Sequence, residues 1–286
     1  MSAAHISVLT AEVLAGLAPQ RGGNYIDGTV GAGGHAAKIL QASDPDGRLL
    51  GLDGDPEALT IAQATLAEFG SRALLVRANF NQLEAVAAAH DFIPARGVLL
   101  DLGLSSMQLA NPGRGFSFVG ETLDMRMDPS AETTAADLVN GLDEVDLANL
   151  IFQYGEEHFS RRIARRIVEA RPVQSAQELA DVIERAVGRH GKIHPATKTF
   201  QALRVAVNHE LDNLEVVLPQ LAQVVGSGGR AAIITFHSLE DRLVKHFFRD
   251  DLNWRNLTKH PLKPAYQEIV ANPRARSAKL RIAERV

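Results

Sequence analysis

Short hydrophobic runs alternate with longer amphipathic stretches over the first hundred residues of the chain. Four runs have the length and apolar content of buried strands, and each is followed by apolar residues at helical spacing. They are residues 25–27, 48–53, 74–76 and 97–101. Because strands that alternate with helices form right-handed βαβ units, the pattern predicts an α/β fold built on a parallel sheet.

The strand pattern then stops and returns only at residues 231–235. The intervening stretch, from about residue 105 to about residue 220, is far too long for one crossover, since most helix–strand connections take a few residues. An inserted helical domain is the economical explanation. We therefore expect an α/β domain at residues 1–110 and 215–286, interrupted by an all-helical domain at residues 111–214.

Polar or aromatic residues stand at the carboxyl ends of all four early strands. Asp27, Asp53 and Asp101 end three of them, and Asn79 and Phe80 follow the remaining one. Ligands of parallel α/β sheets bind in the crevice beyond this edge of the sheet. The sequence therefore predicts a binding site there.

A glycine-rich turn, Asp27-Gly-Thr-Val-Gly-Ala-Gly-Gly-His35, follows the first strand. Gly31, Gly33 and Gly34 would let the backbone approach a ligand closely and then begin a helix. No Gly-Lys-Ser/Thr follows, which excludes a P-loop, but Asp53 stands 20 residues after Gly33, where a dinucleotide fold places its ribose acceptor. The alternative is that the turn only separates a strand from a helix.

Two features favour S-adenosylmethionine (SAM) over NAD as the ligand. Asp27 would repel a pyrophosphate but suits an ammonium group, and the helix N-terminus after Gly34 would attract a single carboxylate. Asn79 and Phe80 offer an amide and an aromatic face to an adenine. The alternative is that Phe80 belongs to the core and Asn79 begins a helix.

The composition narrows the function classes. Of 286 residues, 45% are hydrophobic and 22% charged, as in soluble globular proteins, and no apolar run is long enough for a membrane span. The first residues lack a basic flank and an apolar signal core, so we expect a cytoplasmic protein. The chain has no cysteine, which excludes disulfides, thiolate zinc sites, iron–sulfur clusters and a cysteine nucleophile, and we expect no metal.

The net charge of −4 means that a nucleic-acid partner would have to bind a local basic patch. Residues 159–168, taken as a helix, place Phe159, Ile163 and Ile167 on one face and four arginines opposite. The four, which suit phosphates, are Arg161, Arg162, Arg165 and Arg166. The alternative is a solvated face paired with nearby glutamates. A second basic stretch allows the same two interpretations and consists of Arg274, Arg276, Lys279 and Arg281.

Motifs along most of the chain resemble one family. Besides the glycine-rich turn they are Leu99-Leu-Asp-Leu-Gly-Leu-Ser-Ser106, Arg114-Gly-Phe-Ser-Phe118, Leu123-Asp-Met-Arg-Met-Asp128, His194-Pro-Ala-Thr-Lys-Thr-Phe200, Thr235-Phe-His-Ser-Leu-Glu-Asp-Arg242 and Asn272-Pro-Arg-Ala-Arg-Ser277. They follow the family's order from His5 nearly to Val286. The family is RsmH, also called MraW, the bacterial methyltransferases of small-subunit ribosomal RNA.

The resemblance implies a class I (Rossmann-like) SAM-dependent methyltransferase with an inserted helical domain that recognises the substrate. The implied reaction is methylation of the exocyclic N4 of cytosine 1402 in the 16S rRNA of the small ribosomal subunit. By motif, the family's SAM contacts fall on Gly33, Gly34, His35, Asp53, Phe80, Asp101 and Gln108. The chain departs from the family pattern at Gly54 and Met107, where a basic residue and a proline are common.

The absence of cysteine agrees with an amino-nitrogen target, because methylation of cytosine at C5 ordinarily needs a thiolate that adds to the ring. An exocyclic amine has instead to be held in line with the methyl donor by hydrogen-bond acceptors. Asp101 is the candidate catalytic residue, either as such an acceptor or by orienting SAM. Phe116, Phe118 and His237 are candidates for stacking on the target base, with core packing or helix capping as the alternatives.

Two functions of other classes stay open from the residues alone. A dinucleotide oxidoreductase would use the same glycine-rich turn, and binding of NAD without SAM would favour it. A non-catalytic ribosome-assembly factor would keep the fold, and binding to subunits without methyl transfer would favour that interpretation.

Overall fold

The computed structural model describes residues 7–189, 191 and 193–286. The chain divides into two compact units: unit 1 comprises residues 1–103 and 211–286, and unit 2 comprises residues 104–210. The hydrophobic pattern had placed the domain boundaries at about residues 110 and 215. His5, where the matched motifs begin, lies outside the described residues.

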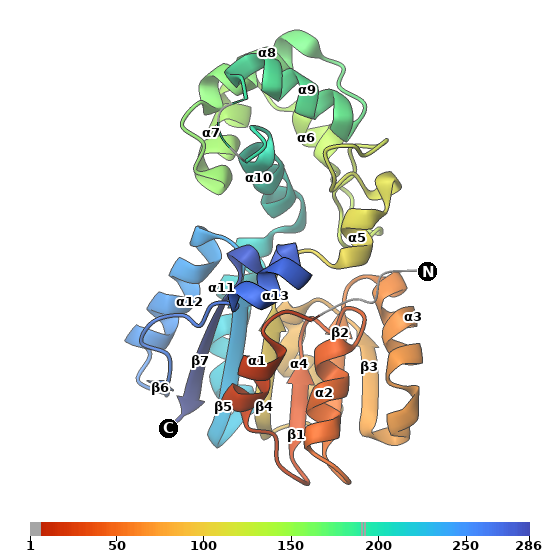
Figure 1. The fold of residues 1–286 in the computed structure, drawn as a ribbon, viewed down its shortest axis with the longest axis vertical. Helices are drawn as coiled ribbons and strands as arrows, with labels where there is room; N and C mark the ends of the chain where they lie inside the picture. Colours follow the sequence, from red (N-terminus) through yellow and green to blue (C-terminus); the bar gives the residue numbers. More distant parts are fainter. Residues whose placement is uncertain (1–6, 190, 192) are drawn as a thin grey trace. The chain divides into compact units, whose positions relative to one another are not determined.

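Unit 1 contains the predicted sheet. Within the described residues, seven strands lie in the order β3-β2-β1-β4-β5-β7-β6 (Figure 1). β1 to β5 pair in parallel, whereas β7 is antiparallel to both β5 and β6. The α/β prediction is thereby confirmed. The strands are β1 (Asn24–Asp27), β2 (Arg48–Asp53), β3 (Ala73–Arg77), β4 (Ala95–Asp101), β5 (Val225–Thr235), β6 (Trp254–Asn256) and β7 (Lys279–Arg285).

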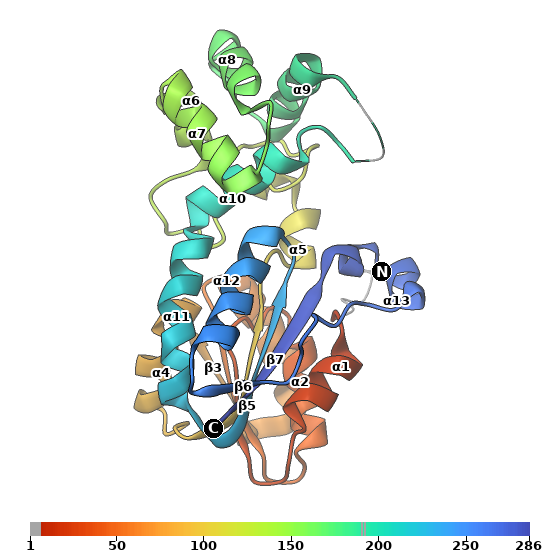
Figure 2. The same ribbon diagram turned by 90° about the vertical axis from the view of Figure 1, so that its left-hand side faces the viewer.

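Helices cover both faces of the sheet (Figures 1 and 2). One face packs against α4 (Leu83–Ala89), α11 (Glu210–Val224) and α12 (Ser238–Asp250), and the other packs against α1 (Thr10–Leu17), α2 (Gly34–Ala42) and α3 (Pro56–Thr65). Three short 3₁₀ helices and one short α-helix complete unit 1 among the described residues: η1 (Ala67–Arg72), η2 (Phe80–Gln82), α13 (Tyr266–Ala271) and η4 (Pro273–Ser277).

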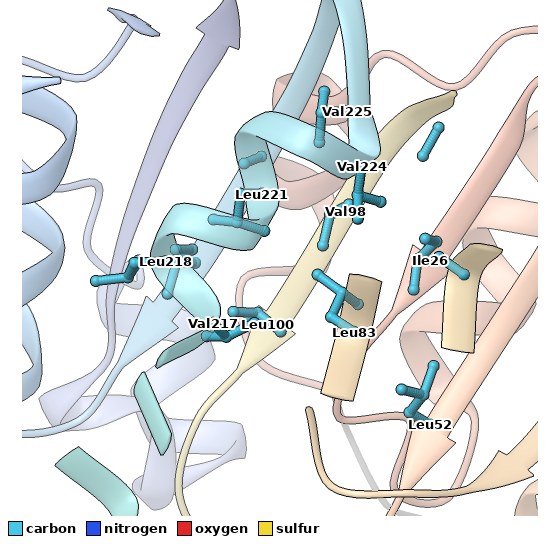
Figure 3. Packing of buried hydrophobic residues seen from close by; sticks show 14 of the residues in the cluster. Ile26, Leu52, Leu83, Val98, Leu100, Val217, Leu218, Leu221, Val224 and Val225 are labelled. Carbon is cyan, nitrogen blue, oxygen red and sulfur yellow. The ribbon is translucent and has the colours of Figure 1, made fainter. Parts of the chain in front are cut away.

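The strands have two buried faces because alternate side chains enter opposite clusters. Ile26 and Leu100 belong to the cluster under α4 and α11, while their neighbours Tyr25 and Leu99 belong to the cluster under α1 and α2. Figure 3 shows the first cluster, in which Leu83 of α4 faces the side chains of the central strands. Each such fully buried apolar side chain contributes roughly 1.5–3 kcal/mol to folding. This packing on both sides fixes the strand ends in position.

The regular secondary structure of unit 2 is helical, joined by turns and irregular segments, and its described residues contain no strand. Its core includes Ile163 and Ile167 of one helix together with Leu179 and Ile183 of the next, all of them fully buried. Its elements are α5 (Ser106–Ala110), η3 (Pro112–Arg114), α6 (Ala135–Gly141), α7 (Glu144–Gly155), α8 (Ser160–Ala170), α9 (Ala176–Val187) and α10 (Thr197–Asn208). Over the described part of the chain, no helix is both long enough and apolar enough to cross a membrane.

Candidate functional site

Three carboxylates end three neighbouring strands of unit 1. β1 lies between β2 and β4, and the parallel register pairs Asp27 with Gly51 on one side and Leu99 on the other. Asp53 and Asp101 each stand two residues further along their strands. The structure therefore brings Asp27, Asp53 and Asp101 to the same edge of the sheet, where the sequence predicted a site.

The glycine-rich turn connects this edge to α2. Gly31 and Gly33 have φ values of 52° and 85°, in the left-handed region that favours glycine. Gly33 is the N-cap of α2, and a Cβ at Gly33 would lie only 3.3 Å from the Cγ of Leu66. Glycine at these two positions lets the turn adopt this backbone without strain and place the free N–H groups of the first turn of α2 at the edge.

Asp53 holds the turn in place. Its Oδ2 accepts a 2.9 Å hydrogen bond from the Gly31 N–H, and its Oδ1 accepts a 2.9 Å bond from the Asp55 N–H. Burial raises the pKa of Asp53, although both of these N–H donors lower it. A carboxylate has about four acceptor positions, so Asp53 keeps capacity for a hydroxyl of a ligand.

His35, the second residue of α2, lies beside two of the carboxylates. Its Nε2 is 3.6 Å from Asp101 Oδ2, and its side chain is 6% exposed. Burial disfavours the charged imidazolium, but the Asp101 and Asp27 carboxylates outweigh burial, and the pKa of His35 is raised. Burial also raises the pKa of Asp27 to about 7, with the His35 charge opposing it. The three groups therefore form one electrostatically coupled cluster.

Three polar atoms of this cluster are buried without a hydrogen-bond partner: Asp27 Oδ2, His35 Nε2 and Asp101 Oδ1. An unsatisfied buried polar atom costs about 1–3 kcal/mol, so three at one edge need an explanation. Ligand groups that donate hydrogen bonds to the carboxylate oxygens would satisfy two of them. An ammonium group does so and carries the complementary charge, which is the chemistry expected of an amino-acid end of SAM.

Thr29 connects two of the strand ends, and sequence reasoning missed it. The Asp101 N–H donates a 2.6 Å hydrogen bond to Thr29 Oγ1, and the Thr29 N–H donates a 3.1 Å bond to Asp27 Oδ1. Its place two residues after a strand-ending aspartate is typical of an Asx-turn, and this spacing was the available signal.

For Asn79 and Phe80 the sequence left two interpretations, adenine binding or a helix start and core packing, and the structure fits part of each. Asn79 caps η2, because its Oδ1 accepts a 3.0 Å bond from the Asn81 N–H. Phe80 is half-buried and packs at the margin of the sheet's core, and its Cβ would be 3.5 Å from a Cβ on Gly28. Phe80 thus lies beside the glycine-rich turn and is only partly buried.

The remaining expected SAM contact, Gln108, belongs to unit 2. Its side chain accepts a 3.0 Å bond from the Ser105 N–H, and its own N–H donates to the Ser105 hydroxyl, which forms a capping box at the start of α5. Gln108 is buried. Its described contacts give it a structural role in unit 2.

The basic face of α8 is exposed as expected. Arg165 Nε lies 3.5 Å from Glu144, and Arg166 pairs with Glu169 at 2.7 Å, whereas Arg161 and Arg162 have no ion pair within the described residues. The face therefore combines two ion-paired arginines with two exposed arginines that have no acidic partner in the described part of the chain.

One detail of this helix was predicted wrongly. Phe159 was expected to pack beside Ile163 and Ile167, which are fully buried, but its side chain is 55% exposed. The reason is that α8 begins at Ser160, so Phe159 is the N-cap residue and departs from the helical angle on which the prediction rested.

The three candidates for stacking on a target base have different environments. Phe116 is buried in the core of unit 2. Phe118 stacks on His194 at a ring-centroid distance of 4.5 Å and contacts Phe200 edge-on. His237 caps α12, because its Nδ1 accepts a 3.4 Å bond from the Glu240 N–H. The structural alternatives therefore account for Phe116 and His237.

The whole chain is similar to one protein family. The model of the MraW methylase family matches residues 2–286. The ribosomal RNA small subunit methyltransferase H of Dehalococcoides mccartyi is 50% identical over 302 residues, which cover 99% of this chain and 86% of the relative. The protein of the same name from Trichormus variabilis is 53% identical over 285 residues, covering 98% and 92%. A solved rRNA methylase from Streptococcus thermophilus covers 97% of this chain and 92% of its own, with 12% identity and a TM-score of 0.45.

Proposed function

The chain belongs to the MraW methylase family, and we propose that it transfers a methyl group from SAM to the exocyclic N4 of cytosine 1402 in 16S rRNA. Its substrate would be the small ribosomal subunit, in keeping with the names of the two relatives. The observation that carries the proposal is the cluster of buried, unsatisfied atoms on Asp27, His35 and Asp101 beside the N-terminus of α2.

The residues at this edge fit the parts of SAM. Asp27 and Asp101 would hold the ammonium group, and the first N–H groups of α2 would hold the carboxylate. Asp53 would accept the ribose hydroxyls, and the exposed side of Phe80 would lie against the adenine. When bound there, SAM supplies an electrophilic methyl group on a sulfonium.

The protein's own contribution to the reaction is to hold the acceptor nitrogen. The lone pair of the cytosine amine is delocalised into the ring. Hydrogen-bond acceptors that hold the two amine hydrogens favour a pyramidal nitrogen, whose lone pair can attack the methyl carbon of SAM. Asp101 is the candidate acceptor, because its Oδ1 is buried and has no hydrogen-bond partner. The alternative role for this oxygen is the one given above, in which Asp101 orients SAM through its ammonium group. The methylated nitrogen is strongly acidic, so no dedicated base is required.

The four arginines of α8 would bind the RNA backbone. They form an exposed cationic surface on a protein whose net charge is −4, and guanidinium groups match phosphate geometry. Contacts of this kind position a nucleic acid without reading its sequence. The target cytosine also has to leave its stack to reach the methyl donor, which costs a few kcal/mol and is easiest in a loop.

Mass spectrometry of 16S rRNA nucleosides tests the proposal. Cells without this gene should lack N4-methylation at the target cytosine, and the purified protein with SAM should restore it on subunits from those cells. Calorimetry with S-adenosylhomocysteine and with NAD tests the oxidoreductase alternative. Binding of S-adenosylhomocysteine supports the methyltransferase, and binding of NAD alone would indicate an oxidoreductase. Binding to subunits without transfer of label from SAM would instead identify an assembly factor.

A further inference from the structure

A basic segment follows β6 in unit 1. We name residues 259–276 the C-terminal arm. It holds four basic residues and one acidic residue, so its net charge is +3 with His260 neutral, in a chain whose net charge is −4. Its basic residues are Lys259, Lys263, Arg274 and Arg276.

The four residues of the second basic stretch, Arg274, Arg276, Lys279 and Arg281, form two pairs with different surroundings in the structure. Lys279 and Arg281 both bind Asp241, at 3.1 Å and 2.7 Å, and Arg281 is buried. These two residues therefore fix β7 to α12. Arg274 and Arg276 are exposed and form no ion pair within the described residues, which leaves their charges available to a partner.

The arm is anchored close to the cofactor site. Ala275, between the two exposed arginines, is fully buried in the same hydrophobic cluster as Ala36 of α2, the neighbour of His35. Glu268 Oε1 accepts a 2.7 Å bond from the Leu9 N–H, and the Glu268 charge helps to raise the pKa of His35. Figure 1 shows α13 at the end of the sheet toward which β1 points, which is the end where the parallel strands finish. η4, which carries Arg274 and Arg276, contacts α13 and is held by buried Ala275, so the two arginines belong to a fixed segment at this end of the sheet.

An aromatic side chain accompanies the two arginines. Tyr266 is 80% exposed, and Val270, one helical turn later on α13, is 63% exposed. Tyr266 belongs to α13, which contacts η4, the element that carries the two arginines. A segment that combines an exposed aromatic ring with guanidinium groups is typical of surfaces that bind single-stranded nucleic acid, because bases stack on the ring while phosphates pair with the cations.

We propose that the C-terminal arm binds the RNA strand next to the target nucleotide, with Arg274 and Arg276 on phosphates and Tyr266 stacked on a base. The proposal rests on the proposed function. RNA is the occupant because the arm is cationic in an acidic protein, and because a nucleotide brought to the sheet edge carries its flanking phosphates past this rim. The contacts would hold the strand while the target base leaves its stack.

The test compares two double variants that each remove two positive charges. Arg274→Ala with Arg276→Ala alters the arm. Arg21→Ala with Arg96→Ala is the control at the opposite end of the sheet, where Arg21 precedes β1, and Arg96, near the start of β4, bonds to Gln20. The probe is small ribosomal subunits from cells without this gene. Affinity is measured over a range of salt concentrations, and SAM binding is measured by calorimetry.

The arm variant should bind subunits at least tenfold more weakly than the control. Its plot of log affinity against log salt should be shallower by about 1.5, since each phosphate contact contributes roughly 0.7–0.9. SAM binding should be unchanged in both. Tyr266→Ala should weaken subunit binding about fivefold, and Tyr266→Phe, which keeps the ring, should not.

Equal affinities and slopes for the two double variants would overturn the proposal, as would equal losses, which would reflect total charge alone. If the arm variant loses SAM binding, the test uses Arg274→Lys with Arg276→Lys in its place. Lysine keeps the positive charge, so this variant should retain most of the salt dependence of subunit binding if phosphates are the partners, and a loss of that dependence would overturn the proposal. Methyl transfer by the unaltered protein to the same subunits is measured in parallel. If the unaltered protein transfers no methyl group, the proposed function is contradicted. If it transfers the methyl group but the arm variant binds subunits as tightly as the control, only the role of the arm is contradicted.

Discussion

The main-chain N–H of Asp101 donates a 2.6 Å hydrogen bond to the hydroxyl of Thr29. This contact joins the end of β4 to the turn after β1, and the Thr29 N–H bonds in turn to Asp27. The two carboxylates that we assign to the SAM ammonium group are therefore placed relative to each other by one threonine. The placement of these carboxylates therefore depends on backbone hydrogen bonds as well as on the side chains themselves.

Replacing Thr29 tests this arrangement. Thr29→Val keeps the shape but leaves the Asp101 N–H without its acceptor, so the free energy of unfolding should fall by about 1–2 kcal/mol. SAM should bind at least fivefold more weakly, and Thr29→Ser should restore most of both. Urea denaturation and calorimetry measure the two effects. Unchanged SAM affinity in the valine variant would show that the contact does not position the site.

The raised pKa of Asp27 predicts a dependence of stability on pH. The unfolded carboxyl ionises near pH 3.8 and the folded one near pH 7, so the folded state retains a proton that the unfolded state releases in between. The stabilisation is complete below pH 3.8 and is lost as the pH rises to about 7, by up to about 4 kcal/mol. Asn at position 27 cannot titrate. The unfolding free energy of the unaltered protein relative to Asp27→Asn should therefore decrease over this range.

The measurement is urea denaturation of both proteins at several pH values from 4 to 8. His35 titrates in the same cluster, and Asp53 and Asp101 also face it, so the comparison is repeated in a His35→Gln background to isolate Asp27. A difference that stays constant from pH 4 to pH 7 would mean that the Asp27 carboxyl has its ordinary pKa. Above pH 7 the difference should level off.

Asp53 should matter for two reasons that can be separated. Asp53→Ala removes a ribose acceptor and also the two backbone bonds that hold the glycine-rich turn, so SAM affinity should fall more than tenfold. Asp53→Asn keeps one acceptor oxygen and should lose less. Calorimetry with S-adenosylhomocysteine measures both. If the alanine variant binds as tightly as the unaltered protein, Asp53 does not belong to the site.

The sequence predicted the strands and their polar ends because burial on both faces leaves a clear local pattern. Ile26 and Leu99 fall within short apolar runs, and Asp27 and Asp101 end those runs. Such information is contained within a few consecutive residues. It needs no knowledge of which strands are neighbours.

Contacts between residues that are far apart in the sequence were harder to predict. Thr29 looks like any turn residue until the sheet brings it to Asp101, 72 positions later in the chain. Lys279 and Arg281 look like a nucleic-acid surface until Asp241 is found beside them. Phe159 was misplaced because the exact start of a helix decides which face its first residue joins. In each case the missing information is tertiary.

The ion pairs on α8 predict that its four arginines contribute unequally to RNA binding. Arg165 and Arg166 already have acidic neighbours in Glu144 and Glu169, so binding a phosphate requires them to exchange one partner for another. Arg161 and Arg162 have no acidic partner among the described residues, so they can bind a phosphate without giving up an ion pair. Arg161→Ala with Arg162→Ala should therefore weaken subunit binding more than Arg165→Ala with Arg166→Ala.

The salt dependence of binding to small ribosomal subunits measures this difference. The first pair should flatten the plot of log affinity against log salt by about 1.5, the second pair by less than 1, and all four substitutions together by no more than about 3. Exposed pairs of this kind contribute little to stability, so the variants should melt within a few degrees of the unaltered protein. An unaltered slope in the quadruple variant would show that α8 is a solvated face. RNA binding would then have to depend on other surfaces, and the C-terminal arm is the one to examine.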